Sequence, residues 1–173
     1  MACAEFLLMQ TYMQMTIRYG LIWMGNIGEQ IANELAINHL GLSPTGFTPV
    51  KHGIDGVFTD NKGKTVVVDS KVTAGNPFLL LHETVKSGNN PQLSDEWISL
   101  NATLMQRSES AQSVGMNPAI GAQIQKAVVE GNLRSILVHT NFETQEIRAY
   151  ERISNENIRS ASSWKMIDSW KME

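Results

Sequence analysis

The sequence predicts an α/β fold in which a mixed central sheet carries a β-hairpin and is flanked by helices. Three observations predict it: helical spacing of apolar residues within residues 25–41, a β-branched run beside a turn-rich segment within residues 52–71, and helix signals followed by an apolar strand between residues 94 and 140. A chain of 173 residues with 42% hydrophobic content is sufficient for one domain with its own core.

The first predicted helix covers residues 25–41 and ends at Gly41, a residue typical of helix stops. Its apolar face is marked by Ile27, Ile31, Leu35 and, near the end, Leu40. Two glutamates, Glu29 and Glu34, lie on the same helix. From the pattern alone each is an ordinary solvated helix residue.

A β-hairpin is expected next, because residues 66–68 are three valines and residues 60–63 are rich in turn formers. If the loop has three residues, Gly63 supplies the left-handed conformation that such loops need. This register pairs Thr59 with Thr65 and Val57 with Val67. The hairpin is therefore specified almost entirely by local sequence.

Continued by two residues, the same register sets Asp55 opposite Asp69, with Cβ atoms about 5 Å apart. Lys71 follows two residues later and returns to the same face of the strand. Two like charges held in this way need a neutralising cation. A one-residue slip would instead pair Asp55 with Ser70 and separate the two aspartates.

Two interpretations of these residues are open from the pattern. In one, Asp55 caps a turn and residues 69–71 are the polar end of an edge strand. In the other they form a site. Asp55, a hairpin and then Asp69-Ser70-Lys71 resemble the signature of the PD-(D/E)XK nuclease superfamily, although Ile54 replaces the proline of that name. The resemblance favours the second interpretation.

The resemblance implies a restriction-endonuclease-like core over about residues 25–142 and a divalent cation, Mg²⁺ or Mn²⁺. The metal ligands that it implies are Asp55, Asp69, the backbone carbonyl of Ser70 and, directly or through water, Glu29. Glu34 is the alternative to Glu29. Lys71 is implied as the residue that orients the attacking water and stabilises the charge that develops on the phosphate.

A second resemblance concerns residues 92–98, Gln-Leu-Ser-Asp-Glu-Trp-Ile, which are similar to a segment in nuclease domains of bacterial polymorphic toxins. Ser94 is a helix cap by its residue type. The resemblance implies that Gln92 lies near the substrate phosphate or the metal. The resemblance also implies that Trp97 anchors this helix to the core; the alternative, plain core packing alongside Leu100 and Leu104, is favoured.

The remaining elements complete the predicted fold. Asn117 and Pro118 indicate a cap and first helical residue, and Gly131 indicates the end of that helix. Residues 135–140 are expected to form a buried strand, with residues 146–151 as its partner across a short turn.

The net charge of −3 does not favour a protein whose whole surface attracts nucleic acid. Any such contact requires metal ions and a local patch, for which the candidates are Lys51, His52, Lys62, Lys64 and Lys86. The alternative is that these are scattered solubilising charges. Cys3 is the only cysteine, which excludes an internal disulfide, and the histidines lack metal-ligand spacing. His39 and His139 are expected to be structural.

Residues 1–24 are predicted to form an apolar, Met-rich helix outside a nuclease-like domain of residues 25–173. This helix packs on the core or serves as a self-association or partner surface. Glu5 argues against a signal peptide, and polar residues interrupt any membrane span. We therefore expect either a cytoplasmic protein or an effector delivered to the cytoplasm of a target cell.

The function hypothesis is a metal-dependent endonuclease that cleaves DNA, as an antibacterial toxin domain with a cognate immunity protein. A restriction, repair or mobile-element nuclease, or an RNase, would share every one of these motifs. A non-catalytic module that binds a partner through the Met-rich helix is the alternative outside enzymes. The presence of Asp55, Asp69 and Lys71 together favours an enzyme.

Overall fold

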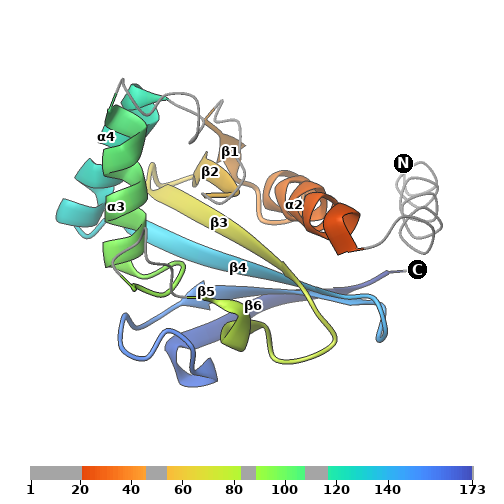
Figure 1. Ribbon diagram of the computed structural model, residues 1–173. Coiled ribbons are helices and arrows are strands. Elements are labelled where there is room, and N and C mark those ends of the chain that lie inside the picture. The colour runs from red at the N-terminus through yellow and green to blue at the C-terminus, as the bar shows by residue number, and fades with distance from the viewer. Residues whose placement is uncertain (1–20, 46–53, 83–88, 108–116, 173) are drawn as a thin grey trace.

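The computed structural model describes residues 21–45, 54–82, 89–107 and 117–172 (Figure 1). Its centre is a six-stranded mixed sheet in the order β1-β2-β3-β4-β5-β6. The strands are β1 (Ser43–Pro44), β2 (Gly56–Thr59), β3 (Thr65–Val72), β4 (Leu133–Asn141), β5 (Glu146–Arg152) and β6 (Trp164–Lys171). The helices are α2 (Leu21–Asn38), α3 (Asp95–Gln106) and α4 (Pro118–Val129), with short 3-10 helices η1 (Pro77–Leu80) and η4 (Ala161–Ser163). The predicted α/β class is confirmed.

Only β3 and β4 are parallel; every other neighbouring pair in the described sheet is antiparallel. The connection between β3 and β4 is a long crossover that contains α3 and α4, as a parallel pair requires. Figure 1 shows α2 on one side of the sheet and the α3–α4 pair on the other.

The predicted register of the hairpin is confirmed over Gly56–Thr59, the residues of β2 that pair with β3. Thr59 pairs with Thr65 and Val57 pairs with Val67. Gly63 has φ +77°, the left-handed conformation expected of it. Asp60 closes the turn by accepting hydrogen bonds from the backbone N–H groups of Lys62 and Lys64, at 2.9 and 2.8 Å.

Alternation along β3 sends side chains to two separate cores. Val66 and Val68 face α2, and the core there also contains Ile27, Ile31, Leu35, Phe58 and Val138. Val67 faces α3 and α4, and the core there also contains Ile54, Trp97, Ile98, Ile124 and Leu137. Asp69 and Lys71 share the parity of Val67, so both charged residues lie on the α3–α4 side.

The helix predicted from Gly25 begins four residues earlier, at Leu21, and Gly41 follows its end with φ +64°. Residues 1–20 lie outside the described part of the chain, as does most of the predicted Met-rich helix. No helix of the described residues has the length and apolar character needed to cross a membrane.

The caps predicted for α3 and α4 are confirmed. The Ser94 hydroxyl accepts from the backbone N–H of Trp97 at 3.1 Å, and the Asn117 side chain accepts from that of Ile120 at 3.3 Å. Trp97 is buried in the core, as favoured from the sequence. β6, which the sequence analysis did not predict, extends the sheet beyond β5.

A candidate carboxylate and lysine site

Asp55 and Asp69 meet where the hairpin opens. Asp69 lies on β3 and is only 1% exposed, while Asp55 directly precedes β2. A carboxylate oxygen of Asp55 accepts a hydrogen bond from the backbone N–H of Ser70 at 2.8 Å. This bond fixes the Asp55 side chain against the strand segment that carries Asp69.

Lys71 completes the polar end of β3. Its ammonium group forms an ion pair with the Asp69 carboxylate and also donates to the backbone carbonyl of Ser70 at 3.2 Å. The ammonium therefore contacts two of the oxygen groups that the family resemblance assigns to a metal ion.

Glu29 approaches the same charges from α2. The helix can come close to β3 because residue 28 is a glycine: a Cβ there would lie 2.5 Å from Cγ2 of Val72 and 2.7 Å from Oγ of Ser70. Burial raises the pKa of Glu29, the negative charge of Asp69 raises it further, and Lys71 lowers it. Glu29 is thus electrostatically part of the cluster.

Glu34, the alternative to Glu29, lies on the exposed side of α2. It accepts a hydrogen bond from the Asn38 side chain at 3.3 Å. It follows Glu29 by five residues, a net rotation of about 140° around a helix of 3.6 residues per turn, so it faces solvent rather than β3. Glu29 is the glutamate that the fold brings toward the aspartates.

The electrostatics of the cluster are dominated by excess negative charge. Burial and, next, the charge of Asp69 raise the pKa of Asp55 to about 8, although the Ser70 N–H and Lys71 oppose the shift; Glu29 adds to it. Lys71 is ion-paired with Asp69, and the remaining negative charge and burial favour the protonated form of Asp55.

The donor chemistry of this cluster fits a hard divalent cation, since carboxylate and carbonyl oxygens are the ligands that Mg²⁺ prefers. Among the described residues, no set of three or more His, Cys, Asp or Glu side chains is arranged as a metal-binding group. Mg²⁺ is commonly held by one or two carboxylates together with water and substrate phosphate, so Asp55, Asp69 and the Ser70 carbonyl are a sufficient set.

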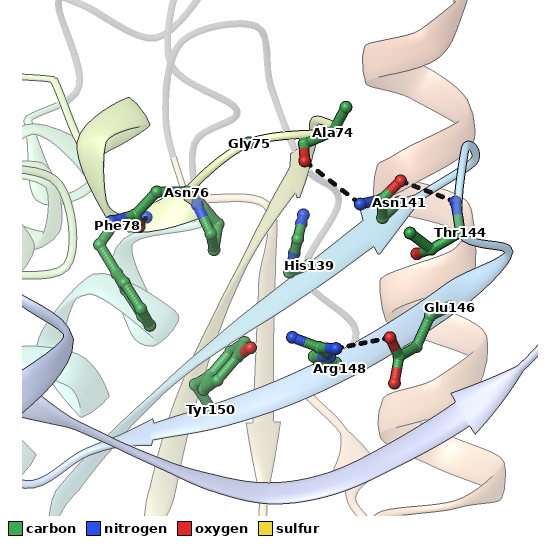
Figure 2. A pocket seen from close by; sticks show the side chains of 11 residues that line it. Ala74, Gly75, Asn76, Phe78, His139, Asn141, Thr144, Glu146, Arg148 and Tyr150 are labelled. Atoms are coloured by element: carbon green, nitrogen blue, oxygen red, sulfur yellow. Dashed lines mark hydrogen bonds and ion pairs between the residues drawn. The ribbon is translucent and has the colours of Figure 1, made fainter.

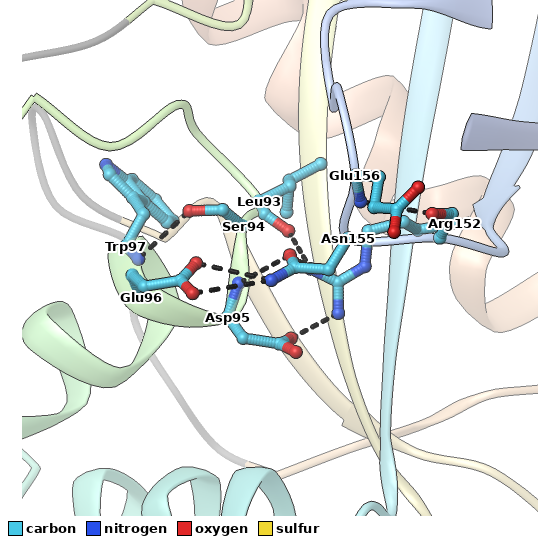
Figure 3. A network of polar contacts seen from close by, with 9 residues as sticks. Leu93, Ser94, Asp95, Glu96, Trp97, Arg152, Asn155 and Glu156 are labelled. Carbon is cyan, nitrogen blue, oxygen red and sulfur yellow. Dashed lines mark hydrogen bonds and ion pairs between the residues drawn. The ribbon is translucent and has the colours of Figure 1, made fainter. Parts of the chain in front are cut away.

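Gln92 lies in the turn before α3, and in the described chain no hydrogen bond joins it to the carboxylates or to Lys71. Its neighbours have structural contacts instead (Figure 3). Arg152 donates to the carbonyl of Leu93 at 2.6 Å and forms an ion pair with Asp95. Leu93 is buried and has φ +65°, so these contacts from β5 hold a bent backbone in place.

The predicted basic patch does not gather at the carboxylates. Lys51, His52 and Lys86 lie outside the described residues. Lys62 and Lys64 are in the hairpin turn before β3, and the five residue steps from Lys64 to Asp69 span about 17 Å of extended strand.

Sequence reasoning missed a cavity on the same face of the sheet, bordered by His139 and Arg148. The alternation His139-x-Asn141 was a usable signal for this cavity, because it sets two polar side chains on one face of a buried strand. The alternation could not show which residues of β3 lie beside them.

His39, also expected to be structural, packs edge-on against Trp170, with ring centroids 5.2 Å apart.

No protein-family model, curated protein or solved structure matches this chain. What defines its class is therefore its own architecture: an α/β protein whose mixed sheet carries buried carboxylates and a lysine at the open end of a hairpin.

Proposed function

We propose that this protein is a nuclease that uses Mg²⁺ or Mn²⁺ to hydrolyse phosphodiester bonds in DNA, built on a restriction-endonuclease-like core. The observation that carries the proposal is the cluster at the open end of the hairpin: Asp55 is bonded to the Ser70 N–H, and Asp69 is ion-paired with Lys71. The charges of Asp69 and Lys71 also act on Glu29. A cluster with such excess negative charge is suited to a divalent cation and, through it, to a phosphate.

Each residue of the carboxylate and lysine site has a proposed role that follows from its position. Asp55 and Asp69, with the Ser70 carbonyl, would hold the cation, which supplies Lewis acidity and a template for in-line attack. Lys71 places a positive charge where negative charge develops on the phosphate, and its N–H groups orient the attacking water. Glu29 on α2 lies close enough for the charges of Asp69 and Lys71 to act on its carboxyl group, which would accept a proton or a water hydrogen bond.

The test is incubation of the purified protein with plasmid DNA and, separately, with total RNA, in Mg²⁺, Mn²⁺ or chelator. We expect metal-dependent loss of DNA, and a fall of about 10²–10³-fold in rate for Asp69→Ala, as for removal of a central electrostatic group. The matched control is Asp168→Ala, which removes an exposed aspartate on β6. Cleavage by a folded Asp69→Ala protein would contradict the proposed site.

Loss of RNA alone would support the same site but identify RNA, rather than DNA, as the substrate. Intact nucleic acid under every condition would favour the partner-binding module. Because β3 buries Asp69, circular dichroism of the variant must first show that its fold is retained.

The role of an antibacterial toxin with an immunity partner is supported only by residues 92–98. Ser94, Asp95 and Trp97 have a cap, an ion pair and a core position that account for their presence. We therefore base the proposal of nuclease activity on the hairpin. Growth arrest on expression in bacterial cells, relieved by Asp69→Ala, would add the toxin role.

A further inference from the structure

A cavity of about 260 Å³ lies between strands β4 and β5 and the segment that leads into η1. A single water needs only about 10–15 Å³, so this space accommodates a larger group. The residues that border the cavity include Phe78, His139, Glu146, Arg148 and Tyr150 (Figure 2).

The cavity is next to the carboxylate and lysine site. In the parallel pairing of β3 with β4, Lys71 is the partner of His139, and His139 in turn pairs with Arg148 on β5. Paired residues face the same side of a sheet, and neighbouring strands are about 4.8 Å apart. A group bound beside His139 would therefore lie one strand away from Lys71.

His139 is 4% exposed and incompletely bonded. Its Nε2 lies 2.8 Å from the carbonyl of Thr73, an acceptor, so Nε2 carries the hydrogen. Its Nδ1 is buried without a hydrogen-bond partner in the described chain. Burial lowers the pKa of His139, which keeps the ring neutral and Nδ1 an acceptor. The ring of His139 borders the cavity, so a small shift of the ring on binding would let a ligand N–H supply the donor that Nδ1 lacks.

The other residues that border the cavity limit the kind of ligand that it can bind. Arg148 is paired with Glu146 at 2.6 Å, so the cavity has no surplus positive charge with which to hold a phosphate. Phe78 and Tyr150 form an aromatic wall, with ring centroids 5.1 Å apart. An uncharged, flat group with N–H donors and ring acceptors suits this combination, which is how proteins bind unstacked nucleobases.

We propose that this cavity binds an unpaired nucleobase of the substrate strand, next to the phosphate that the carboxylate site cleaves. The inference rests on the proposed nuclease function for its biological meaning, but the binding itself requires no metal. Arg148 and Glu146 read the polar edge of the base, and the aromatic wall packs against its ring.

The experiment is titration of the full chain, in chelator, with each of the four deoxynucleosides, followed through the ¹⁵N signals of the histidine rings. At least one deoxynucleoside should shift the His139 ring signal, with Nδ1 the nitrogen that moves. Arg148→Met should weaken that binding about tenfold, the loss expected for one hydrogen bond to a charged group. Lys126→Met is the control, because it breaks a local ion pair on α4, far from the cavity.

No shift of the His139 signal with any of the four, or equal binding by Arg148→Met, would overturn the proposal. Failure of the two proposals can be told apart. Deoxynucleoside binding by a protein that cleaves no nucleic acid would keep the base pocket and reject the nuclease, whereas metal-dependent cleavage without deoxynucleoside binding would do the reverse.

Discussion

At the scale of single residues, the ionisation of Asp55 depends strongly on folding. Burial and Asp69 raise its pKa from 3.8 to about 8. Between those values the folded protein binds a proton that the unfolded chain releases, so the free energy of unfolding must fall as the pH rises through that window. In chelator we expect urea unfolding to show a loss of more than about 1 kcal/mol across it.

Asp55→Asn should flatten this pH dependence, because the amide does not titrate. Asp168→Asn, at an exposed aspartate on β6, should leave it unchanged. Addition of Mg²⁺ should restore stability mainly at the alkaline end, where Asp55 is ionised. An unaltered slope in Asp55→Asn would show that another group controls the transition.

Lys71 competes with a metal ion for the same oxygens, since its ammonium contacts the Asp69 carboxylate and the Ser70 carbonyl. Lys71→Met should therefore tighten Mn²⁺ binding, by about tenfold for the loss of one adjacent positive charge. Cleavage should fall at the same time, because the charge that faces the phosphate is gone. Titration followed by electron paramagnetic resonance measures the first effect, and weaker Mn²⁺ binding by the variant would contradict the competition.

At the scale of elements, two glycines set how closely helices approach their neighbours. Gly28 admits α2 to β3, and Gly121 admits α4 to α3, where a Cβ would lie 2.6 Å from the carbonyl oxygen of Ala102. Alanine at either position should cost about 1–3 kcal/mol of stability by overpacking. Only Gly28→Ala should also weaken the response to metal, because it displaces Glu29.

Gly25→Ala is the control on α2, where a Cβ has nothing within 4 Å; it should stabilise the helix by about 0.5–1 kcal/mol. Thermal unfolding with and without Mn²⁺ compares the three variants. An equal loss of metal response in Gly121→Ala would mean that general loosening, rather than the position of Glu29, is responsible.

The elements that the sequence predicts well are those specified locally. The hairpin register follows from a turn at Gly63 and a run of valines, and α3 and α4 follow from Ser94 and Asn117 as caps. β6 lacks such signals: much of it is exposed, and a bulge between Ala149 and Tyr150 shifts its pairing with β5. A strand without clean alternation has no period for a sequence pattern to detect.

At the scale of the whole molecule, one part of the candidate site follows from local sequence and the other depends on the pairing of distant strands. Asp55, Asp69 and Lys71 belong to one hairpin, so their proximity was predictable. The position of Lys71 beside His139 depends on a parallel pairing across the 73–132 crossover, and no local signal fixes that register. The base pocket could therefore be found only in the folded molecule.

The charge of the entire protein leads to the last prediction. With a net charge of −3, the chain as a whole repels DNA, and the two described candidate lysines lie far from the carboxylates along β3. Binding should therefore depend on the cation that neutralises the cluster. At about 0.15 M salt, filter retention of labelled DNA should be weak in chelator and should increase with Ca²⁺, which takes the same oxygen ligands.

Asp69→Ala should lose the increase with Ca²⁺, while Lys126→Met, at an exposed position on α4, should retain it. Equal retention with chelator and with Ca²⁺ would mean that a basic surface, rather than the carboxylate cluster, recruits the DNA. Within the predicted basic patch, the residues left to form such a surface are Lys51, His52 and Lys86, because Lys62 and Lys64 lie in the hairpin turn, away from the carboxylates. Substitution of Lys51, His52 and Lys86 together would then abolish binding that Asp69→Ala leaves intact.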